Sequence, residues 1–279
     1  MVFRSVDIVA LVELGFYVPA LLAAFIVCSR HGFSRSSGWY YTFTLCLIRA
    51  IGAVCQLVTI AKPDSLGLIK TVLVLNHIGL TPLLLATLGM LSRLVDWINF
   101  KLDPPLLTVK HFRLAQLFVL LGAVFGIIGI SQATSTSSVS TWSRVAVLCY
   151  AATYLLLVFF FVRSASYVSY LPDSEHLLTP VITMALPLVL ARLVYQLLLV
   201  FVNRGPFSRN DRHVAPSIAM SVAEEMLVVL MFLALGLKLR KLSEAEQGPI
   251  LMRPWKDRTK RRGRRRDGGM QGDDGLTYR

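Results

Sequence analysis

Ionisable side chains interrupt several long apolar stretches of this sequence, where a charge needs a structural or chemical reason. These positions are Glu13, Arg49, His77 with its neighbour Asn76, Arg192, and the adjacent pair Glu224 and Glu225. Glutamate and arginine can form buried ion pairs, and an imidazole can exchange protons near neutral pH. A charged side chain at the centre of a bilayer costs at least about 3 kcal/mol. We therefore expect these residues to pair with one another or to line a polar cavity.

Polar residues also repeat at helical spacing around three of these positions. Residues three, four and seven apart lie on one face of a helix. The faces are Arg49, Gly52 and Gln56; Arg192, Tyr195, Gln196 and Leu199; and Ser217, Ser221 and Glu225 with Glu224 beside them. The spacing predicts that Tyr195 and Gln196 face the same polar space as Arg192.

The surrounding composition is that of a membrane protein. The 279 residues are 55% hydrophobic and 16% charged, against about 25% charged in soluble domains. Seven apolar stretches approach the roughly 20 residues that a helix needs to cross a bilayer. They cover residues 6–28, 39–60, 68–91, 112–131, 144–162, 177–202 and 216–237. The predicted fold is all-α, a polytopic bundle of seven transmembrane helices over residues 1–240, followed by a disordered basic tail over residues 241–279.

The first stretch resembles a signal peptide in its position, but we expect it to be retained. Its apolar run is long, Asp7 and Glu13 interrupt it, and no small-x-small cleavage site follows it. The four cysteines lie in apolar stretches without metal-ligand or disulfide-framework spacing, so buried thiols are expected.

Orientation is predicted from the basic residues near the ends of the spans. The short loops divide their Lys and Arg evenly between the two sides, and the basic loop over residues 203–215 argues against an outer N-terminus. The tail tips the balance towards an outer N-terminus and a cytoplasmic C-terminus. Its basic residues are expected either to contact anionic inner-leaflet lipid or to remain solvated. Those assigned to lipid contact are Lys238, Arg240, Lys241, Arg261, Arg262, Arg264, Arg265 and Arg266.

With this orientation, the charged positions of five predicted helices lie at one depth, roughly 10–17 Å below the outer surface at 1.5 Å per residue. Glu13, Glu224 and Glu225 can then face Arg49 and Arg192. The predicted helices over 112–131 and 144–162 carry no ionisable residue at that depth and are expected to be a lipid-facing or supporting pair. Two interpretations stay open: a functional cavity, or charge pairs that only specify helix packing, and His77 alone is compatible with either.

Motifs of several functional classes are missing from the sequence. There is no lysine within the last predicted span for a retinal Schiff base, no phosphate-binding loop and no metalloprotease or hydrolase signature. We expect no enzyme activity, cofactor, metal site or nucleic-acid partner. A G-protein-coupled-receptor-like sensor fits the architecture, but the Asn-Pro-x-x-Tyr motif and an acidic residue before Arg93 are missing.

Three segments resemble an uncharacterised fungal family of seven-helix integral membrane proteins. They are Leu80–Gly89 (LTPLLLATLG), Ala191–Tyr195 (ARLVY) and Glu224–Glu225, within a likeness over about residues 5–240. The family has no established activity, so the resemblance implies fold and location only. A more distant architectural likeness links the chain to fungal lipid-translocating exporter-like proteins.

These observations lead to one functional hypothesis and its alternatives. The first is a membrane protein that binds, senses or translocates a small amphipathic or lipid-like molecule in a polar cavity between its helices. The alternatives are a non-catalytic membrane scaffold and the receptor-like sensor.

Overall fold

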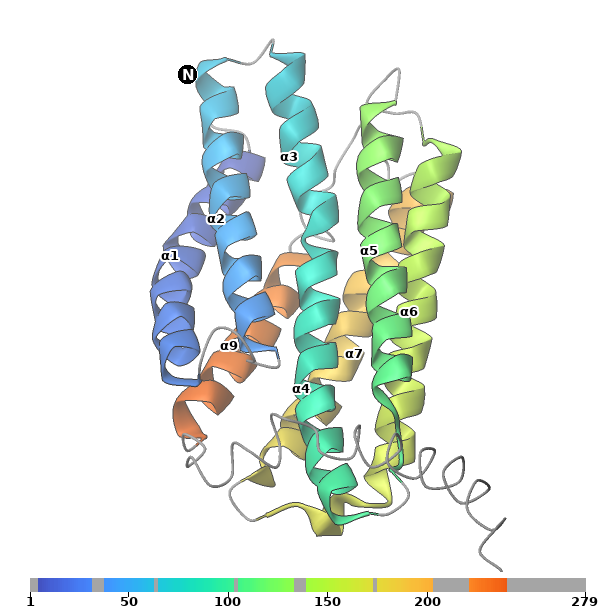
Figure 1. Ribbon diagram of the computed structural model, residues 1–279. Coiled ribbons are helices and arrows are strands. Elements are labelled where there is room, and N and C mark those ends of the chain that lie inside the picture. Colours follow the sequence, from blue (N-terminus) through green and yellow to red (C-terminus); the bar gives the residue numbers. More distant parts are fainter. Residues whose placement is uncertain are drawn as a thin grey trace, which may run out of the picture.

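The computed structural model describes residues 5–31, 38–62, 65–102, 105–132, 139–172, 175–202 and 221–239. Throughout these ranges the regular structure is helical. The elements are α1 (Ser5–His31), α2 (Trp39–Ala61), α3 (Leu66–Ile78), α4 (Leu80–Lys101), α5 (Val109–Ser131), α6 (Thr141–Ala165), the 3-10 turn η1 (Val168–Tyr170), α7 (Leu178–Leu197), the π-helical turn η3 (Leu198–Val202) and α9 (Ala223–Lys238). Figure 1 shows a bundle of long helices in which α4 continues α3 in the same direction.

Six helical stretches are long and apolar enough to cross a membrane, which confirms an all-α polytopic membrane protein. The described part of the last predicted span is α9, whose 16 residues are shorter than the other six stretches. The preceding part of that prediction, residues 216–220, lies outside the described residues. The predicted tail over residues 241–279 lies outside them as well.

The third stretch differs from its prediction, because α3 and α4 together form 36 residues from Leu66 to Lys101. At 1.5 Å per residue this is about 54 Å, well beyond the roughly 30 Å of hydrocarbon. A turn at Gly79 separates α3 from α4, and Pro82 in the first turn of α4 needs no amide partner there. The helix itself does not end at residue 91, the predicted end of the span, because α4 continues past Arg93 and Asp96, which are both buried.

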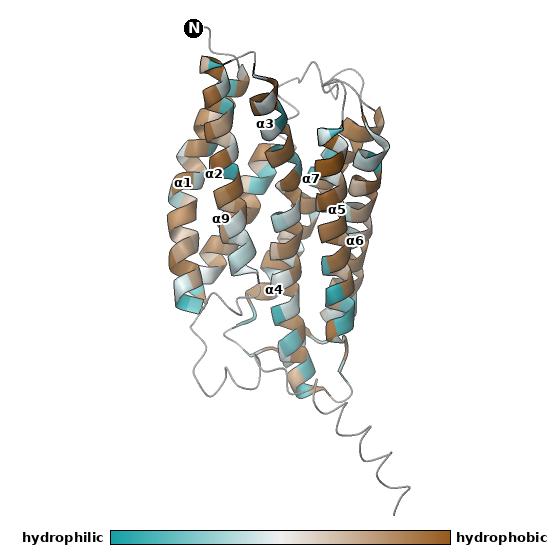
Figure 2. Cartoon of the chain, turned by 45° about the horizontal axis from the view of Figure 1, so that its top comes forward, coloured by the Kyte–Doolittle hydropathy of each residue, from teal (hydrophilic) through white to brown (hydrophobic). Residues whose placement is uncertain are grey.

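A belt of exposed apolar side chains surrounds the bundle. Examples are Leu22 of α1, Val54 of α2, Leu120 of α5 and Leu155 of α6, which are each about half exposed or more. Figure 2 shows hydrophobic colour along the middle of these helices and hydrophilic colour mainly towards the ends of the bundle. Water would not tolerate an apolar surface of this extent, so lipid is the solvent for this belt.

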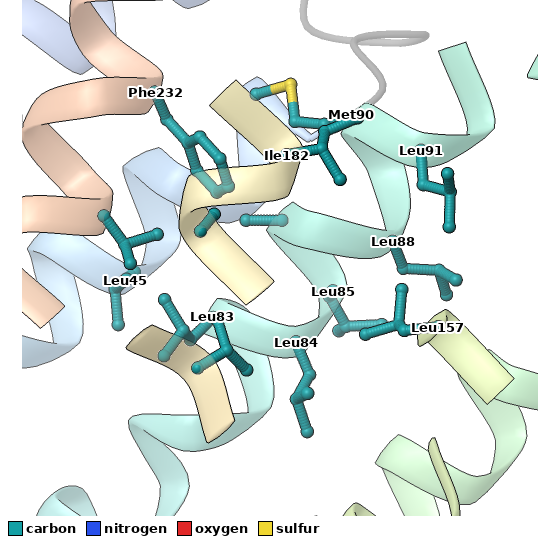
Figure 3. Close-up of a cluster of buried hydrophobic side chains, with 14 of the residues drawn as sticks. Leu45, Leu83, Leu84, Leu85, Leu88, Met90, Leu91, Leu157, Ile182 and Phe232 are labelled. Atoms are coloured by element: carbon teal, nitrogen blue, oxygen red, sulfur yellow. The ribbon is translucent and has the colours of Figure 1, made fainter. Parts of the chain in front are cut away.

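Helix α4 forms the centre of the bundle. All but three of its 22 residues are buried, and it contacts α2, α5, α6 and α7. Figure 3 shows its leucines packed against side chains of the neighbouring helices, among them Leu45 of α2, Leu157 of α6 and Phe232 of α9. This apolar core occupies the part of the bundle on which α2, α7 and α9 converge.

Candidate functional site

A polar cavity of about 110 Å³ lies between α1, α2, α3, α7 and the residues that precede α9. Its polar lining consists of Glu13, Arg49, Gln56, Asn76, His77, Arg192, Tyr195, Gln196 and Ser221. Its apolar lining consists of Val6, Val9, Ala10, Val72, Leu73, Leu199 and Val222, with Gly52 beside them. The cavity lies in the half of the bundle that holds the start of α1 and the end of α2.

Arg49 of α2 and Glu225 of α9 form a buried two-pronged ion pair at this site. Nε and Nη2 of Arg49 donate to the two carboxylate oxygens of Glu225. Nη1 of Arg49 donates to the side-chain oxygen of Asn76 at 3.0 Å. A planar guanidinium matches a carboxylate in this geometry, and all three nitrogens of Arg49 have acceptors.

Gly79 makes the position of Arg49 possible. A Cβ atom at Gly79 would lie 3.0 Å from Nη2 of Arg49, closer than nearly all real contacts of that kind. The guanidinium therefore lies directly against the backbone at the junction of α3 and α4.

Arg192 of α7 is the second buried cation, with 2% of its surface exposed. Its Nη2 donates to the backbone oxygen of Asn76 at 3.2 Å. Its Nε lies 3.3 Å from Oε2 of Glu225, within ion-pair distance. This nitrogen nevertheless has no hydrogen-bond partner among the described residues, because the angle is unsuitable. Arg192 is thus less completely bonded than Arg49.

Glu13 of α1 is held more loosely than Glu225. Its Oε1 lies 4.0 Å from Nη1 of Arg49, and its side chain is 12% exposed where that of Glu225 is fully buried. Glu225 also accepts a long 3.5 Å hydrogen bond from the hydroxyl of Tyr17. Two carboxylates therefore share the site, one embedded among donors and one facing the cavity.

Most of the candidate residues that the helical spacing grouped lie together at the cavity. The two complete polar faces, one on α2 from Arg49 to Gln56 and one on α7 from Arg192 to Leu199, both line the cavity. Of the third face, Ser221 lines the cavity and Glu225 contacts Arg49, whereas Ser217 lies outside the described residues. No lining residue comes from α5 or α6, as expected for a supporting pair.

The structure separates the two adjacent glutamates that the sequence treated alike. Glu224 is partly exposed, does not line the cavity and forms no ion pair with the described residues. Its Oε2 atom is buried without a hydrogen-bond partner there. Successive residues of a helix point about 100° apart, so the two glutamates cannot both face the arginines. The one that does is Glu225.

His77 is buried against α5 rather than projecting freely into the cavity. Its ring lies 5.9 Å from the ring of Tyr150. A Cβ atom at Gly126 of α5 would overlap the imidazole, so glycine is required for this packing. His77 both lines the cavity and joins α3 to the supporting pair.

A second buried ion pair was missed by the sequence analysis, which assigned Arg93 to the inner end of a span. Arg93 of α4 donates from Nε to Oε2 of Glu175 at 3.0 Å and from Nη2 to Oε1 of the same residue. Leu94, Val95, Trp97 and Ile98 continue the apolar pattern beyond Arg93, and this signal could have extended the helix. Glu175 had no signal of its own, because it lies between α6 and α7.

The predicted lipid-contact residues are mostly outside the described part of the chain. Lys238, in the last turn of α9, is exposed. Arg240, Lys241 and the five arginines of residues 261–266 lie beyond the described residues. Nearby, Arg30 donates to the backbone oxygen of Leu237 at 2.9 Å, so the end of α1 binds a terminal carbonyl of α9.

Comparison with known proteins gives a family without an assigned activity. No curated protein and no solved structure matches the chain. A family model described as "Domain of unknown function (DUF7702)" matches residues 3–242, which include every helix that the structure describes and the two ion pairs given above. The match and the bundle of membrane helices agree in their extent, and the chain belongs to the DUF7702 family.

Proposed function

We propose that this protein binds a small amphipathic molecule, polar end first, in the cavity between α1, α2, α3, α7 and the residues that precede α9, and that it senses or moves this molecule rather than transforming it. The observation that carries the proposal is a polar cavity inside a bundle of membrane helices. Its charged residues lie beside apolar ones such as Val9, Leu73 and Leu199. Such a lining suits a ligand with a polar and an apolar part.

The size of the cavity limits what enters it. One water needs about 10–15 Å³ of cavity measured with a water-sized probe, so a cavity of about 110 Å³ holds roughly eight waters. A whole lipid does not fit. A head group of a few non-hydrogen atoms fits, with its apolar part along the valines and leucines of the lining.

The proposed topology has seven crossings, with α9 as the last, an outer N-terminus and a cytoplasmic C-terminus. Exposed basic residues of the described part support it. On the side where α1 ends lie Arg30, Lys101, Lys110, Arg113, Arg163 and Lys238, and on the other side lie Lys62, Lys70 and Arg144. The cytoplasmic side of a membrane protein carries the excess of Lys and Arg. The basic tail then lies near anionic inner-leaflet lipid.

A scaffold that only holds its helices together is the second candidate. The bonding of Arg49 favours it, because Glu225 and Asn76 occupy all three of its nitrogens. The two candidates differ in what a filled cavity does. A scaffold retains its function when the cavity is filled, and a binding protein loses it.

Gly52→Leu is the variant that tests the proposal, because Gly52 lines the cavity and a Cβ there meets its nearest neighbour, Leu75, at 3.7 Å. Gly15→Leu is the matched control, since a Cβ there meets nothing within 4 Å. The full chain is placed in nanodiscs and its melting temperature is measured with hexylamine, hexanoate and 2-aminohexanoate. These six-carbon amphiphiles carry an ammonium, a carboxylate or both.

At least one amphiphile is expected to raise the melting temperature of the unmodified protein and of Gly15→Leu, but not of Gly52→Leu. Equal responses of Gly52→Leu and Gly15→Leu, or no response to any amphiphile, overturn the proposal in favour of the scaffold. Reconstitution in liposomes then separates carrier from sensor, because a carrier releases the bound amphiphile from loaded vesicles.

A further inference from the structure

We infer that the cavity selects a zwitterionic head group, with its cationic end at Glu13 and its anionic end at Arg192. The inference rests on the proposed function and specifies its ligand. It starts from the hydrogen bonding of the four charged residues at the site, which divide into a saturated pair and an unsaturated pair.

Arg49 and Glu225 are the saturated pair. The three nitrogens of Arg49 have acceptors, and both oxygens of Glu225 accept from Arg49. Glu225 is fully buried and lies beneath the lining rather than within it. These hydrogen bonds use three of the five N–H groups of Arg49 and are charge-assisted, which makes them among the strongest in proteins. Arg49 and Glu225 also balance each other's charge, so neither needs a charged ligand.

Arg192 supplies the cationic site. It lines the cavity with 2% of its surface exposed, and its Nε is buried without a hydrogen-bond partner among the described residues. A buried unsatisfied donor is costly, and the guanidinium of Arg192 as a whole makes one hydrogen bond with the described residues, to the backbone oxygen of Asn76. An anionic ligand oxygen in the cavity would give this guanidinium a further acceptor. The carboxylate of Glu225 already fixes the plane of this guanidinium from 3.3 Å.

Glu13 supplies the anionic site. It lines the cavity, and the described residues give it one ion-pair contact, 4.0 Å from Arg49, and no hydrogen bond. Its oxygens can therefore accept from an ammonium. Because Glu13 belongs to α1 and Arg192 to α7, a ligand that bridges them joins two helices that no described ion pair connects directly.

A ligand with both charges matches this arrangement better than a ligand with one. An ammonium alone leaves the donor of Arg192 unsatisfied, and a carboxylate alone leaves the oxygens of Glu13 unsatisfied. A zwitterion supplies a partner to each and leaves the total charge of the site unchanged, which matters where the dielectric constant is low. Gln196 and Ser221 offer neutral hydrogen-bonding groups in the same lining.

A free amino-acid-like molecule and a phospholipid head group share this chemistry. The experiment therefore uses full-length protein in nanodiscs of phosphatidylglycerol, whose lipid is not zwitterionic. Dissociation constants are measured by calorimetry for 2-aminohexanoate, hexylamine and hexanoate, and for dihexanoylphosphatidylethanolamine, whose head group carries an N–H ammonium, as the lipid source. A zwitterion is expected to bind at least tenfold more tightly than hexylamine and hexanoate.

Variants assign the two ends of the ligand. Glu13→Gln is expected to lower zwitterion affinity at least tenfold and leave hexanoate binding unchanged. Arg192→Gln is expected to lower zwitterion affinity at least tenfold and to leave hexylamine binding unchanged. Glu224→Gln is the control for Glu13→Gln, since it removes a carboxylate outside the cavity lining, and it should change no affinity more than twofold.

The outcomes separate this inference from the proposed function. If hexylamine or hexanoate binds as tightly as both zwitterions, the inference of a zwitterionic ligand is overturned. The proposed binding function still holds in that case, provided that binding is lost in Gly52→Leu. No binding of any of the four probes overturns both. Tighter binding of the phosphatidylethanolamine identifies a lipid head group, and tighter binding of 2-aminohexanoate identifies a free solute. The unmodified protein decides between these outcomes even if a variant does not fold.

Discussion

Arg49 and Glu225 illustrate what a single charged residue can do in this protein. Each would be expensive to bury alone, and together they leave no guanidinium nitrogen and no carboxylate oxygen without a partner. A buried ion pair is weak support for stability as a whole, but breaking it by removing one partner is costly. The pair therefore fixes how α2 and α9 meet, whatever the cavity beside it binds.

We predict that Glu225→Gln destabilises the protein by about 3–5 kcal/mol, because it leaves two buried cations, Arg49 and Arg192, with the looser Glu13 as the one carboxylate still within ion-pair distance of either among the described residues. The double variant Arg49→Leu with Glu225→Leu removes both charges and should be less damaging than the single variant. Melting temperatures of the detergent-solubilised proteins test this. If the double variant is at least as unstable as Glu225→Gln, the ion pair stabilises the protein more than two leucines in its place do.

Sequence spacing found this site but could not complete it. A period of 3.6 residues shows which residues share a face, so Arg49 with Gln56 and Arg192 with Gln196 were assigned correctly. It does not show how each helix is rotated against its neighbours, and that rotation distinguishes Glu225 from Glu224. The spacing also could not predict the partner of Arg93, because Glu175 lies in a connection with no helical period.

At the scale of the elements, small residues decide how closely the helices approach. Gly122, Gly126 and Gly129 recur at helical spacing on α5, and Cβ atoms there would overlap Tyr150, His77 and Ser143 respectively. Small residues at such intervals let membrane helices pack closely. This face joins α5 to α6 on one side and, through His77, to the cavity on the other.

We predict that Gly126→Leu lowers the melting temperature and also weakens ligand binding, because the new side chain must displace the imidazole of His77. Overpacking of this kind typically costs about 1–3 kcal/mol. Gly67→Leu on α3 is the control, since a Cβ there has no neighbour within 4 Å. An unchanged melting temperature in Gly126→Leu would mean that α5 and α3 can move apart without loss of stability.

At the scale of the whole molecule, the two ends of the bundle differ. The cavity lies in the half that holds the start of α1, whereas the Arg93–Glu175 pair and the contact of Arg30 with α9 lie in the other half. Between them α4 carries an apolar core (Figure 3). A ligand that enters the cavity is thus separated from the opposite side by this apolar core.

Because of this asymmetry, the orientation of the chain determines which side of the membrane the cavity faces. Single cysteines can measure that orientation. Leu66, 70% exposed at the start of α3, and Tyr170, 41% exposed in η1 after α6, lie at opposite ends of the bundle. Each is changed to cysteine in a chain whose four native cysteines are replaced by serine. Sealed microsomes, whose cytoplasmic face is outward, are treated with a membrane-impermeant maleimide before and after permeabilisation.

We predict that Tyr170→Cys is labelled in sealed microsomes and that Leu66→Cys is labelled only after permeabilisation, because the excess of exposed basic residues lies on the side of η1. The cavity then faces the lumen or the exterior. The reverse pattern would place it on the cytoplasmic side and invert the topology. Equal labelling of both cysteines in sealed vesicles would contradict the membrane crossing by α3 and α4, which brings the chain from one end of the bundle to the other.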